Sequence, residues 1–456
     1  MAFEFHHLDK WAFSNLDLSE ETMESQHKAV ILISGASSSG KSYAARYLKE
    51  LFNQNGHKAL ILSLDKYNFG LSGIIPNKVN LNYFNNSLPN MEEIESKIKK
   101  IIYDVPFDSK YKPEILEKIR ASIKDLINPE LMNTFIDGLS AEWKKLNFDE
   151  PTVYNLQEAS QDIIKLLNNE KVSEKRYSKV ICERLESTYA FDGHKYDVII
   201  AEGIYALDES FLSCLKTVSF IKNFIDGNPK SLFLRRIIRD SKITSADNVF
   251  TVNLYFKYIV KSYKETIAPC RLKADVILNN NMSFTELRAG ALYRTKDEIF
   301  TSDQELINRI KGKSEIVSVQ YQEDYYLVNE DDTQLDKNNI IRFRQVSADE
   351  GKTYLPSSLI HKGAPKSRFD NKVIRPINIL LSEEEFTKVW PDKDSCLSDF
   401  INSGFKIGKI EKKRKTRLIF HNQKITLREI ENKGTYIEFS STCDEKEVAE
   451  IKKLIC

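Results

Sequence analysis

Few features of this sequence favour an extracellular, membrane-bound or nucleic-acid-coating protein. The six cysteines among its 456 residues are scattered without a CxxC pair, which argues against a disulfide framework or a zinc site. The longest apolar runs, Ala29–Ile33 and Val198–Ala201, suit buried strands and are too short to cross a bilayer. With 67 basic and 66 acidic side chains, the net charge of +1 gives no reason to expect a nucleic-acid partner. We therefore expect a cytoplasmic protein that binds neither membrane nor nucleic acid.

The chain is long enough for two or three domains, and its first part alternates predicted strands with helical spacing. Apolar, β-branched runs predict strands at Ala29–Ile33, Lys58–Leu64, Asp197–Ile200 and Thr217–Phe224. Strands that alternate with helices are typical of an α/β fold, a mostly parallel sheet with helices on both faces. We assign this domain to residues 29–285, after an N-terminal extension at residues 1–28.

Two other regions depart from this pattern. Between about residues 89 and 146, Glu, Lys, Ile and Leu recur at helical spacing, which predicts a helical insertion. This insertion either caps the active site or is a solvated decoration, and the sequence favours neither. From residue 286 to residue 456, short alternating segments with polar turns predict an antiparallel barrel or sandwich, which we assign as an α+β antiparallel β-barrel domain.

A glycine-rich turn between the first predicted strand and the first predicted helix indicates a phosphate-binding loop. The turn consists of Gly35, Ala36, Ser37, Ser38, Ser39, Gly40, Lys41 and Ser42. The two glycines allow backbone N–H groups to face phosphate oxygens, Lys41 reaches the terminal phosphates, and the hydroxyl of Ser42 can ligate Mg²⁺. The pattern alone recurs by chance, but here it lies between a strand and a helix, as the mechanism requires.

Two acidic residues follow predicted strands of the same sheet. Asp65 ends the second strand, where an aspartate can orient a substrate hydroxyl, take its proton or hold Mg²⁺ through water. Glu202 ends the third strand and can bind the hydration shell of the metal. The alternative for Asp65 is a surface turn, and for Glu202 it is a turn or a helix cap. We predict that both residues serve phosphoryl transfer.

Residues 29–280 resemble the uridine kinase / phosphoribulokinase family of P-loop kinases. The resemblance is carried, in chain order, by Gly35–Ser42 (GASSSGKS), Leu62–Tyr67 (LSLDKY), Asn147–Pro151 (NFDEP), Arg176–Ser178 (RYS), Ala201–Leu207 (AEGIYAL) and Leu234–Asp240 (LRRIIRD). It implies ATP as the phosphoryl donor, with Mg²⁺ as cofactor. It further implies that Asp65 is the general base on a sugar hydroxyl and that Asp149 holds the ribose hydroxyls.

The same resemblance implies roles for several later residues. Tyr177 lies against the base or the sugar of the acceptor, and we count Arg184 among the acceptor contacts. A lid helix that closes on the phosphates contains Arg235, Arg236 and Arg239. Without the family, that arginine cluster reads equally well as a solvated helix face. By analogy alone, a homodimer is also expected.

Two departures from the family concern the acceptor. Uridine kinases carry a histidine a few residues after the tyrosine to read the pyrimidine edge, and Lys179–Arg184 contains none. The lid loop Ser241–Asp247 also has fewer basic residues than the family's. We therefore predict phosphoryl transfer to a nucleoside or another small hydroxylated acceptor, without assigning uridine.

Basic residues in the C-terminal domain occur in pairs two positions apart, a spacing that puts both side chains on the same face of a strand. Arg342 and Arg344 alternate, and so do Lys412 and Arg414. The full predicted set of tunnel phosphate-binding residues is Lys296, Arg342, Arg344, Lys362, Arg375, Lys412, Arg414 and Arg417. Gathered inside a barrel, these side chains form a tunnel for pyrophosphate or polyphosphate. The alternative is an outward, solubilising role, and spacing alone slightly favours it.

The C-terminal domain resembles the CYTH, or triphosphate tunnel metalloenzyme, family. The resemblance is carried by Ile340–Arg344 (IIRFR), Ile360–Gly363 (IHKG), Gly404–Phe405, Lys412–Arg414 and Gly434–Glu438 (GTYIE). A uridine kinase-like domain joined to such a tunnel is the arrangement of a plant group of fusion proteins. The family's opening Glu-x-Glu-x-Lys signature retains only Lys296 here, and of the closing-strand acids Glu438 remains as a metal ligand.

Three functional hypotheses follow from these observations. The first is an ATP-dependent kinase of the uridine kinase type that carries a phosphate-binding tunnel. The second is a pyrophosphatase or triphosphatase in the tunnel, with a regulatory kinase domain. The third is a non-catalytic regulator that binds nucleotide and polyphosphate. The loss of metal-binding carboxylates favours a tunnel that binds phosphate chains but hydrolyses them weakly.

Overall fold

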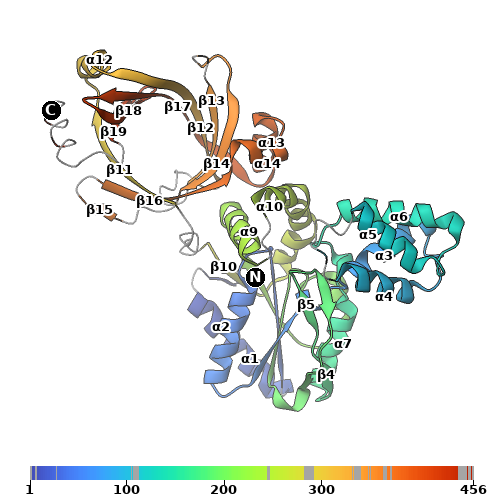
Figure 1. Ribbon diagram of the computed structural model, residues 1–456. Helices are drawn as coiled ribbons and strands as arrows, with labels where there is room; N and C mark the ends of the chain where they lie inside the picture. Colours follow the sequence, from blue (N-terminus) through green and yellow to red (C-terminus); the bar gives the residue numbers. More distant parts are fainter. Residues whose placement is uncertain are drawn as a thin grey trace. The chain divides into compact units, whose positions relative to one another are not determined.

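The structure, a computed structural model, divides into two compact units. It describes residues 3–5, 8–26, 28–103, 105, 112–243, 247–281, 292–330, 332, 340–347, 349, 351–362, 367–369, 372–439, 449 and 453. The first unit comprises Met1–Gly227, Arg239–Ala246 and Lys257–Asn281. The second comprises Asn228–Ile238, Asp247–Phe256 and Met282–Cys456, and Figure 1 shows the elements of both.

A six-stranded sheet forms the centre of the first unit, in the order β1-β10-β9-β2-β8-β3. Its strands are β1 (Phe3–Phe5), β2 (Ala29–Gly35), β3 (Ala59–Ser63), β8 (Val198–Glu202), β9 (Ile221–Asp226) and β10 (Val276–Asn279). Every neighbouring pair is parallel, so each connection must cross over the sheet. The predicted α/β fold is therefore confirmed.

Helices cover both faces of this sheet. On one face, α1 (Leu8–Gln26) and α2 (Lys41–Gln54) pack against buried residues such as Ile31 and Ile200. On the other face, α7 (Leu156–Leu167) and α8 (Glu209–Cys214) pack against Leu32 and Ile199. Because both faces are covered, the central strands are apolar throughout, which is why their sequence signal is a continuous apolar run.

The N-terminal segment is an integral part of the first unit. Residues 1–28 were expected to be an extension, but β1 pairs with β10 and α1 packs on the sheet. The indole of Trp11 is fully buried and donates a hydrogen bond of 2.8 Å to Oδ1 of Asn223 on β9. Asn15 donates to the same oxygen at 2.9 Å. These buried polar contacts fix α1 against the sheet, so the first unit has no structural boundary at residue 28.

The predicted helical insertion is present and forms a core of its own. It consists of α3 (Leu71–Phe84), α4 (Met91–Ile102), α5 (Pro113–Ile123) and α6 (Pro129–Lys144). The apolar faces of these helices bury residues such as Ile98, Ile119 and Phe135 against one another. The insertion begins at Leu71, before residue 89, with α3. The sequence did not predict this helix because it contains Pro76 and its apolar residues show no helical periodicity.

Shorter elements complete the first unit. Four short strands form two hairpin-like pairs: β4 (Lys171–Ser173) with β7 (Ala190–Asp192), and β5 (Arg176–Ser178) with β6 (Glu183–Leu185). Further helical segments are α9 (Pro229–Ile243), which contributes residues to both units, and α11 (Val260–Ser262), whereas α10 (Asn248–Leu254) belongs to the second unit.

The second unit is an antiparallel sheet in the order β11-β19-β18-β17-β12-β13-β14-β16-β15. Its strands are β11 (Leu292–Thr301), β12 (Glu315–Asn329), β13 (Ile340–Ser347), β14 (Leu355–Lys362), β15 (Ser367–Phe369), β16 (Lys372–Leu381), β17 (Phe405–Phe420), β18 (Gln423–Ile430) and β19 (Gly434–Phe439). Because β11 pairs with both β19 and β16, the chain of pairings returns to its starting strand, as a barrel requires. The predicted barrel is visible in Figure 1.

Helices lie between the strands of the barrel in the chain. Helix α12 (Gln304–Gly312) packs Leu306 and Ile310 against Leu418 and Leu427 on the strands. Helices α13 (Glu383–Val389) and α14 (Lys393–Asn402) follow β16. Of the helices that the structure describes, none combines the length and apolar character needed to span a bilayer.

Candidate active site

The predicted phosphate-binding loop lies at the carboxyl end of β2, directly before α2. At Gly35 φ is +144°, and a Cβ atom there would lie 2.3 Å from the carbonyl oxygen of Ile225. At Gly40 φ is +102°, and a Cβ atom would lie 2.5 Å from Nδ2 of Asn280. Both conformations favour glycine, and neither position has room for a side chain. The loop geometry therefore explains why glycine occupies both positions.

Lys41 points back into this loop. Its ammonium donates hydrogen bonds to the carbonyl oxygens of Gly35 at 3.0 Å and Ala36 at 2.7 Å. Burial lowers the pKa of Lys41 to about 8, and the nearby carboxylate of Glu202 partly opposes that shift. An anion among these groups would add charge-assisted hydrogen bonds to the ammonium and favour its protonated form.

The serines of the loop fit a phosphate group. The hydroxyls of Ser38 and Ser39 are buried, and no hydrogen-bond partner for them is found among the described residues. A buried hydroxyl without a partner is costly, and phosphate oxygens are suitable acceptors for it. The amide of Asn280 donates to the carbonyl oxygen of Ser39 at 2.7 Å and so fixes the loop. The residues present therefore fit a bound phosphate chain.

Two carboxylates lie at the ends of strands that neighbour each other. Glu202 ends β8, and its register partner on β3 is Ser63, two residues before Asp65. Burial raises the pKa of Glu202, and the negative charge of Asp65 raises it further. The Ser42 hydroxyl donates to Oε2 of Glu202 at 3.2 Å. A hydroxyl beside a carboxylate is a donor set that suits Mg²⁺ held partly through water, so these two residues fit the predicted metal.

Asp65 has an ionic partner that the sequence analysis missed. The carboxylate lies in the turn Leu64–Tyr67, and its Oδ2 is 2.7 Å from the ammonium of Lys179. Burial alone would raise the pKa of Asp65, because it disfavours the charged carboxylate. The positive charges of Lys179, Lys41 and Arg239 have the larger effect and hold the pKa of Asp65 below its usual range. Lys179 is 114 residues away in the chain, so no local pattern could indicate the contact.

The predicted acceptor contacts differ in their surroundings. Asp149 is buried, and its backbone carbonyl accepts a hydrogen bond from the Tyr205 hydroxyl. Tyr177 lies on β5, where burial raises the pKa of its phenol. Arg184 donates from Nη2 to both carboxylate oxygens of Glu158, each at 2.9 Å. Arg184 therefore has a structural partner on α7, and the acceptor contacts of Asp149 and Tyr177 stay predictions.

Of the three predicted lid arginines, the structure brings Arg239 to the phosphate loop. Its Nη1 lies 3.2 Å from the Ser37 hydroxyl, and its Nε donates to Asp240 at 2.9 Å. Arg235 and Arg236 belong to the second unit. The proposed phosphate contact of the arginine cluster therefore rests on Arg239.

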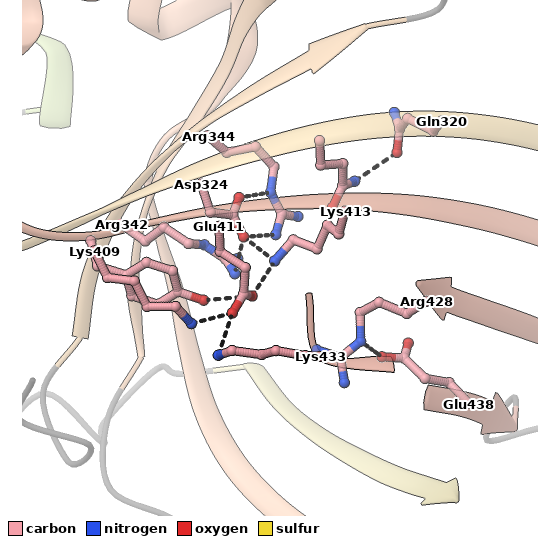
Figure 2. A network of polar contacts seen from close by, with 12 residues as sticks. Gln320, Asp324, Arg342, Arg344, Lys409, Glu411, Lys413, Arg428, Lys433 and Glu438 are labelled. Carbon is pink, nitrogen blue, oxygen red and sulfur yellow. Dashed lines mark hydrogen bonds and ion pairs between the residues drawn. The ribbon is translucent and has the colours of Figure 1, made fainter. Parts of the chain in front are cut away.

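In the second unit, register shows which charged residues share a face of the barrel. Asp324 on β12 is directly opposite Arg344 on β13 and Glu411 on β17. Arg342 and Lys413 lie two residues along from these positions, so all five side chains point to the same side. Figure 2 shows them turned toward one another. The predicted pair of arginines is thus on the inner face, together with Lys413, which the sequence analysis did not include.

The fully buried carboxylate of Asp324 is the centre of this cluster. It accepts from Nη1 of Arg342 at 2.8 Å and from Nε of Arg344 at 2.6 Å, and it pairs with the ammonium of Lys413. These three cations outweigh the effect of burial and hold the pKa of Asp324 well below its usual range. Burial lowers the pKa of Lys413 to about 8, against the opposing charge of Asp324.

Glu411 is the second acidic member of the cluster. It pairs with Lys409, with Lys413 at 3.1 Å and with Lys433 at 3.5 Å. Burial disfavours its charge, but the ammonium groups of Lys409 and Lys413 lower the pKa of Glu411 to about 2. We name Asp324, Arg342, Arg344, Lys409, Glu411, Lys413 and Lys433 the barrel charge cluster.

The other predicted tunnel residues are divided between the two faces of the strands. Lys412 is on the opposite face, 55% exposed and 3.8 Å from Glu323. Arg414 shares that face and lies over the ring of Tyr321. Arg417 is exposed but shares the face of Lys413, four residues away on β17, and Lys362 is half-buried beside Ile340 on the same face as Arg342.

Three predictions concern the metal and the ends of the barrel. Glu438, the predicted tunnel metal ligand, forms an ion pair of 2.7 Å with Arg428. The strands that carry Lys296 and Arg375 pair with each other, but both side chains lie outside the described residues. In the part of the chain that the structure describes, no group of three or more His, Cys, Asp or Glu side chains is placed to hold a metal ion.

Comparisons with known proteins support the kinase part of the chain. Residues 119–284 match the model of the Phosphoribulokinase / Uridine kinase family. A uridine kinase of Lactobacillus johnsonii is 29% identical over 143 residues, which is 31% of this chain and 65% of that enzyme. The chain thus spans slightly less than two thirds of that relative's length. The matches support a P-loop kinase domain of this family within the first 284 residues.

Solved structures give only weak likenesses. A possible uridine kinase from Bacillus stearothermophilus is 13% identical and aligns over 58% of this chain and 98% of its own, with a TM-score of 0.30. The PH1819 protein from Pyrococcus horikoshii is 16% identical and aligns over 36% of this chain and 88% of its own, with a TM-score of 0.27. Scores this low carry no argument about function.

Proposed function

We propose that the first unit is an ATP-dependent phosphotransferase of the uridine kinase type, which acts on a nucleoside or another small hydroxylated acceptor. One observation carries the proposal: the phosphate-binding loop, Asp65 and Glu202 follow three neighbouring parallel strands, β2, β3 and β8. The carboxyl ends of such strands form the ligand site of an open α/β sheet. The family match to uridine kinases supports the same chemistry.

In this proposal each residue has a defined role. Loop amides, Lys41 and Arg239 bind the phosphates of ATP and stabilise the charge that develops during transfer. Asp65 accepts the proton of the acceptor hydroxyl as its oxygen bonds to the γ-phosphorus. The bond between the γ-phosphorus and the bridging oxygen breaks, and ADP leaves. Ser42 and Glu202 would hold Mg²⁺, which would supply neutralisation of the charge on the phosphates.

Replacement of Asp65 by asparagine tests the proposed general base. Acceptor-dependent ADP release should fall by at least about 10²-fold, because the amide cannot take a proton. The affinity for ATP, measured by calorimetry, should change little because the variant keeps the shape of the side chain. An acceptor-dependent rate close to that of the wild type would contradict the role of Asp65.

The pH dependence of ATP binding tests the role of Lys41. Its pKa of about 8 is that of the nucleotide-free site, and the protonated form binds the phosphates. Affinity should therefore be constant below pH 8 and fall above it, by up to about tenfold for each pH unit. Calorimetric titrations between pH 7 and 9.5 would measure this. The variant Lys41→Met should bind weakly without that pH dependence, and an equal dependence in the variant would contradict the assignment.

For the second unit we propose binding of phosphate chains with little hydrolysis. In the barrel charge cluster, five basic side chains surround two carboxylates, which leaves an excess of positive charge in a low-dielectric site. The pairing of Glu438 with Arg428 further reduces the carboxylates available to a metal. Inorganic triphosphate should therefore bind, and Arg342→Ala should weaken it at least tenfold without affecting ATP binding by the first unit. Rapid metal-dependent release of phosphate would overturn this proposal.

A further inference from the structure

The acceptor side of the proposed kinase site contains a cation that the roles above leave unused. Lys179 lies in the turn between β5 and β6, and its side chain is 45% exposed. Its ammonium is 2.7 Å from Oδ2 of Asp65. In the proposed mechanism the carboxylate of Asp65 must contact the acceptor hydroxyl. The phosphate-loop cations, Lys41 and Arg239, act on the nucleotide in the proposed mechanism. Lys179 is therefore a basic residue placed at the acceptor side of the site.

Hydrogen bonds to the helical insertion anchor the hairpin β5–β6, so the backbone of Lys179 has a defined position. Buried Glu183 accepts hydrogen bonds from the backbone N–H of Ser72 at 3.0 Å and from its hydroxyl at 2.8 Å. The N–H of Leu71 donates to the carbonyl oxygen of Cys182 at 3.0 Å. From α4, Lys99 donates to the carbonyl oxygen of Arg184 at 2.9 Å. The helical insertion thus anchors the loop that presents Lys179 to Asp65.

An ammonium ion bound to a general base weakens that base. Lys179 competes with the acceptor hydroxyl for Oδ2 of Asp65, and it holds the pKa of that carboxylate low. A neutral acceptor offers Lys179 no better partner and leaves the ion pair in place. An acceptor with its own negative group offers a second anion, which can draw the ammonium away and leave the carboxylate open to the hydroxyl.

We infer that the acceptor carries an anionic group, a carboxylate or a phosphate, and that Lys179 moves from Asp65 to that group when the acceptor binds. This inference rests on the proposed kinase function and narrows its substrate class. Lys179 is then the residue that sets specificity for a charged acceptor. The thiol of Cys182 and the half-buried phenol of Tyr177 lie near it and can contact the uncharged part of the acceptor.

The test compares three acceptors with Mg²⁺ and ATP: uridine, which is neutral, glycerate, a hydroxy carboxylate, and ribose 5-phosphate, a sugar phosphate. At least one anionic acceptor should exceed uridine in kcat/KM by tenfold or more. In Lys179→Gln the KM for that acceptor should rise about 10- to 100-fold, with a smaller change in kcat. Lys179→Arg, which keeps the charge, should restore much of the affinity. A change of KM for glycerate would identify the anionic group as a carboxylate, and a change for ribose 5-phosphate would identify it as a phosphate.

Lys66→Gln is the matched control. Lys66 is next to Asp65 and similarly exposed, at 42%, but it pairs with Glu174 at 3.4 Å. Its replacement should leave the KM of every acceptor unchanged. Preference for uridine, or an anionic acceptor whose KM is the same in Lys179→Gln, would overturn the inference and leave the kinase proposal standing. Absence of both ATP binding and ADP release in the wild type would instead overturn the kinase proposal itself.

Discussion

Replacement of Lys41 by methionine is expected to lower acceptor-dependent ADP release by about 10³-fold. The methionine keeps the length of the side chain but removes the ammonium that would meet the transferring phosphoryl group. Loss of a single preorganised donor to developing charge typically costs about 10²–10³ in kcat, and Lys41 is also expected to bind ground-state phosphates. Steady-state assays of ADP formation with saturating acceptor would measure the effect, and calorimetry would separate ATP binding from turnover.

The control for this prediction is Lys28→Met. Like Lys41, Lys28 donates to two backbone carbonyl oxygens, those of Leu166 at 2.9 Å and Gly193 at 2.7 Å, and burial lowers its pKa. It has no proposed role at the phosphates, so its replacement should lower stability but leave kcat within about threefold of the wild type. Equal losses of kcat in the two variants would mean that Lys41 acts through the fold alone.

Local patterns in the sequence were enough to predict the phosphate loop and its sheet. Gly35 and Gly40 occur at fixed offsets after a fully buried strand, and the mechanism of phosphate binding depends on those offsets. Asp65 and Glu202 could also be found, because each lies at or just after the carboxyl end of an apolar strand. Lys179 could not, because its contact with Asp65 depends on how a distant hairpin is anchored by the helical insertion.

In the barrel, the alternation of residue types predicts the strands more reliably than it predicts which face of the sheet each side chain occupies. The run from Lys412 to Lys415 is basic at every position, so its composition contains no period of two. Register with β12 settles the question: Lys413 lies opposite Gln322 on the face of Asp324, whereas Lys412 lies opposite Glu323. No pattern in the sequence predicted that Asp324 pairs with the inner cations, because Asp324 lies among polar and aromatic residues that form no recognisable motif.

The buried position of Asp324 leads to a large predicted effect on stability. In Asp324→Asn, Arg342, Arg344 and Lys413 stay buried without their shared counter-ion, because the amide has no charge. Removal of one partner from a buried ion pair typically costs about 3–5 kcal/mol in the free energy of unfolding. Trp390, the one tryptophan of the second unit, is 3% exposed and can report unfolding by urea in a Trp11→Phe, Trp143→Phe background.

The effect of Asp324→Asn should also depend on pH, with Glu323→Gln as control. The pKa of Asp324 is lowered in the folded state, so its contribution to stability is present above the unfolded pKa, about 3.9, and is lost as pH falls below it. The difference between wild type and variant should therefore be full at pH 7 and shrink toward pH 2. Glu323 lies next in the strand but on the other face, 3.8 Å from exposed Lys412, so its replacement should cost at most about 1 kcal/mol. A similar loss in both variants would show that the barrel charge cluster does not depend on the buried carboxylate.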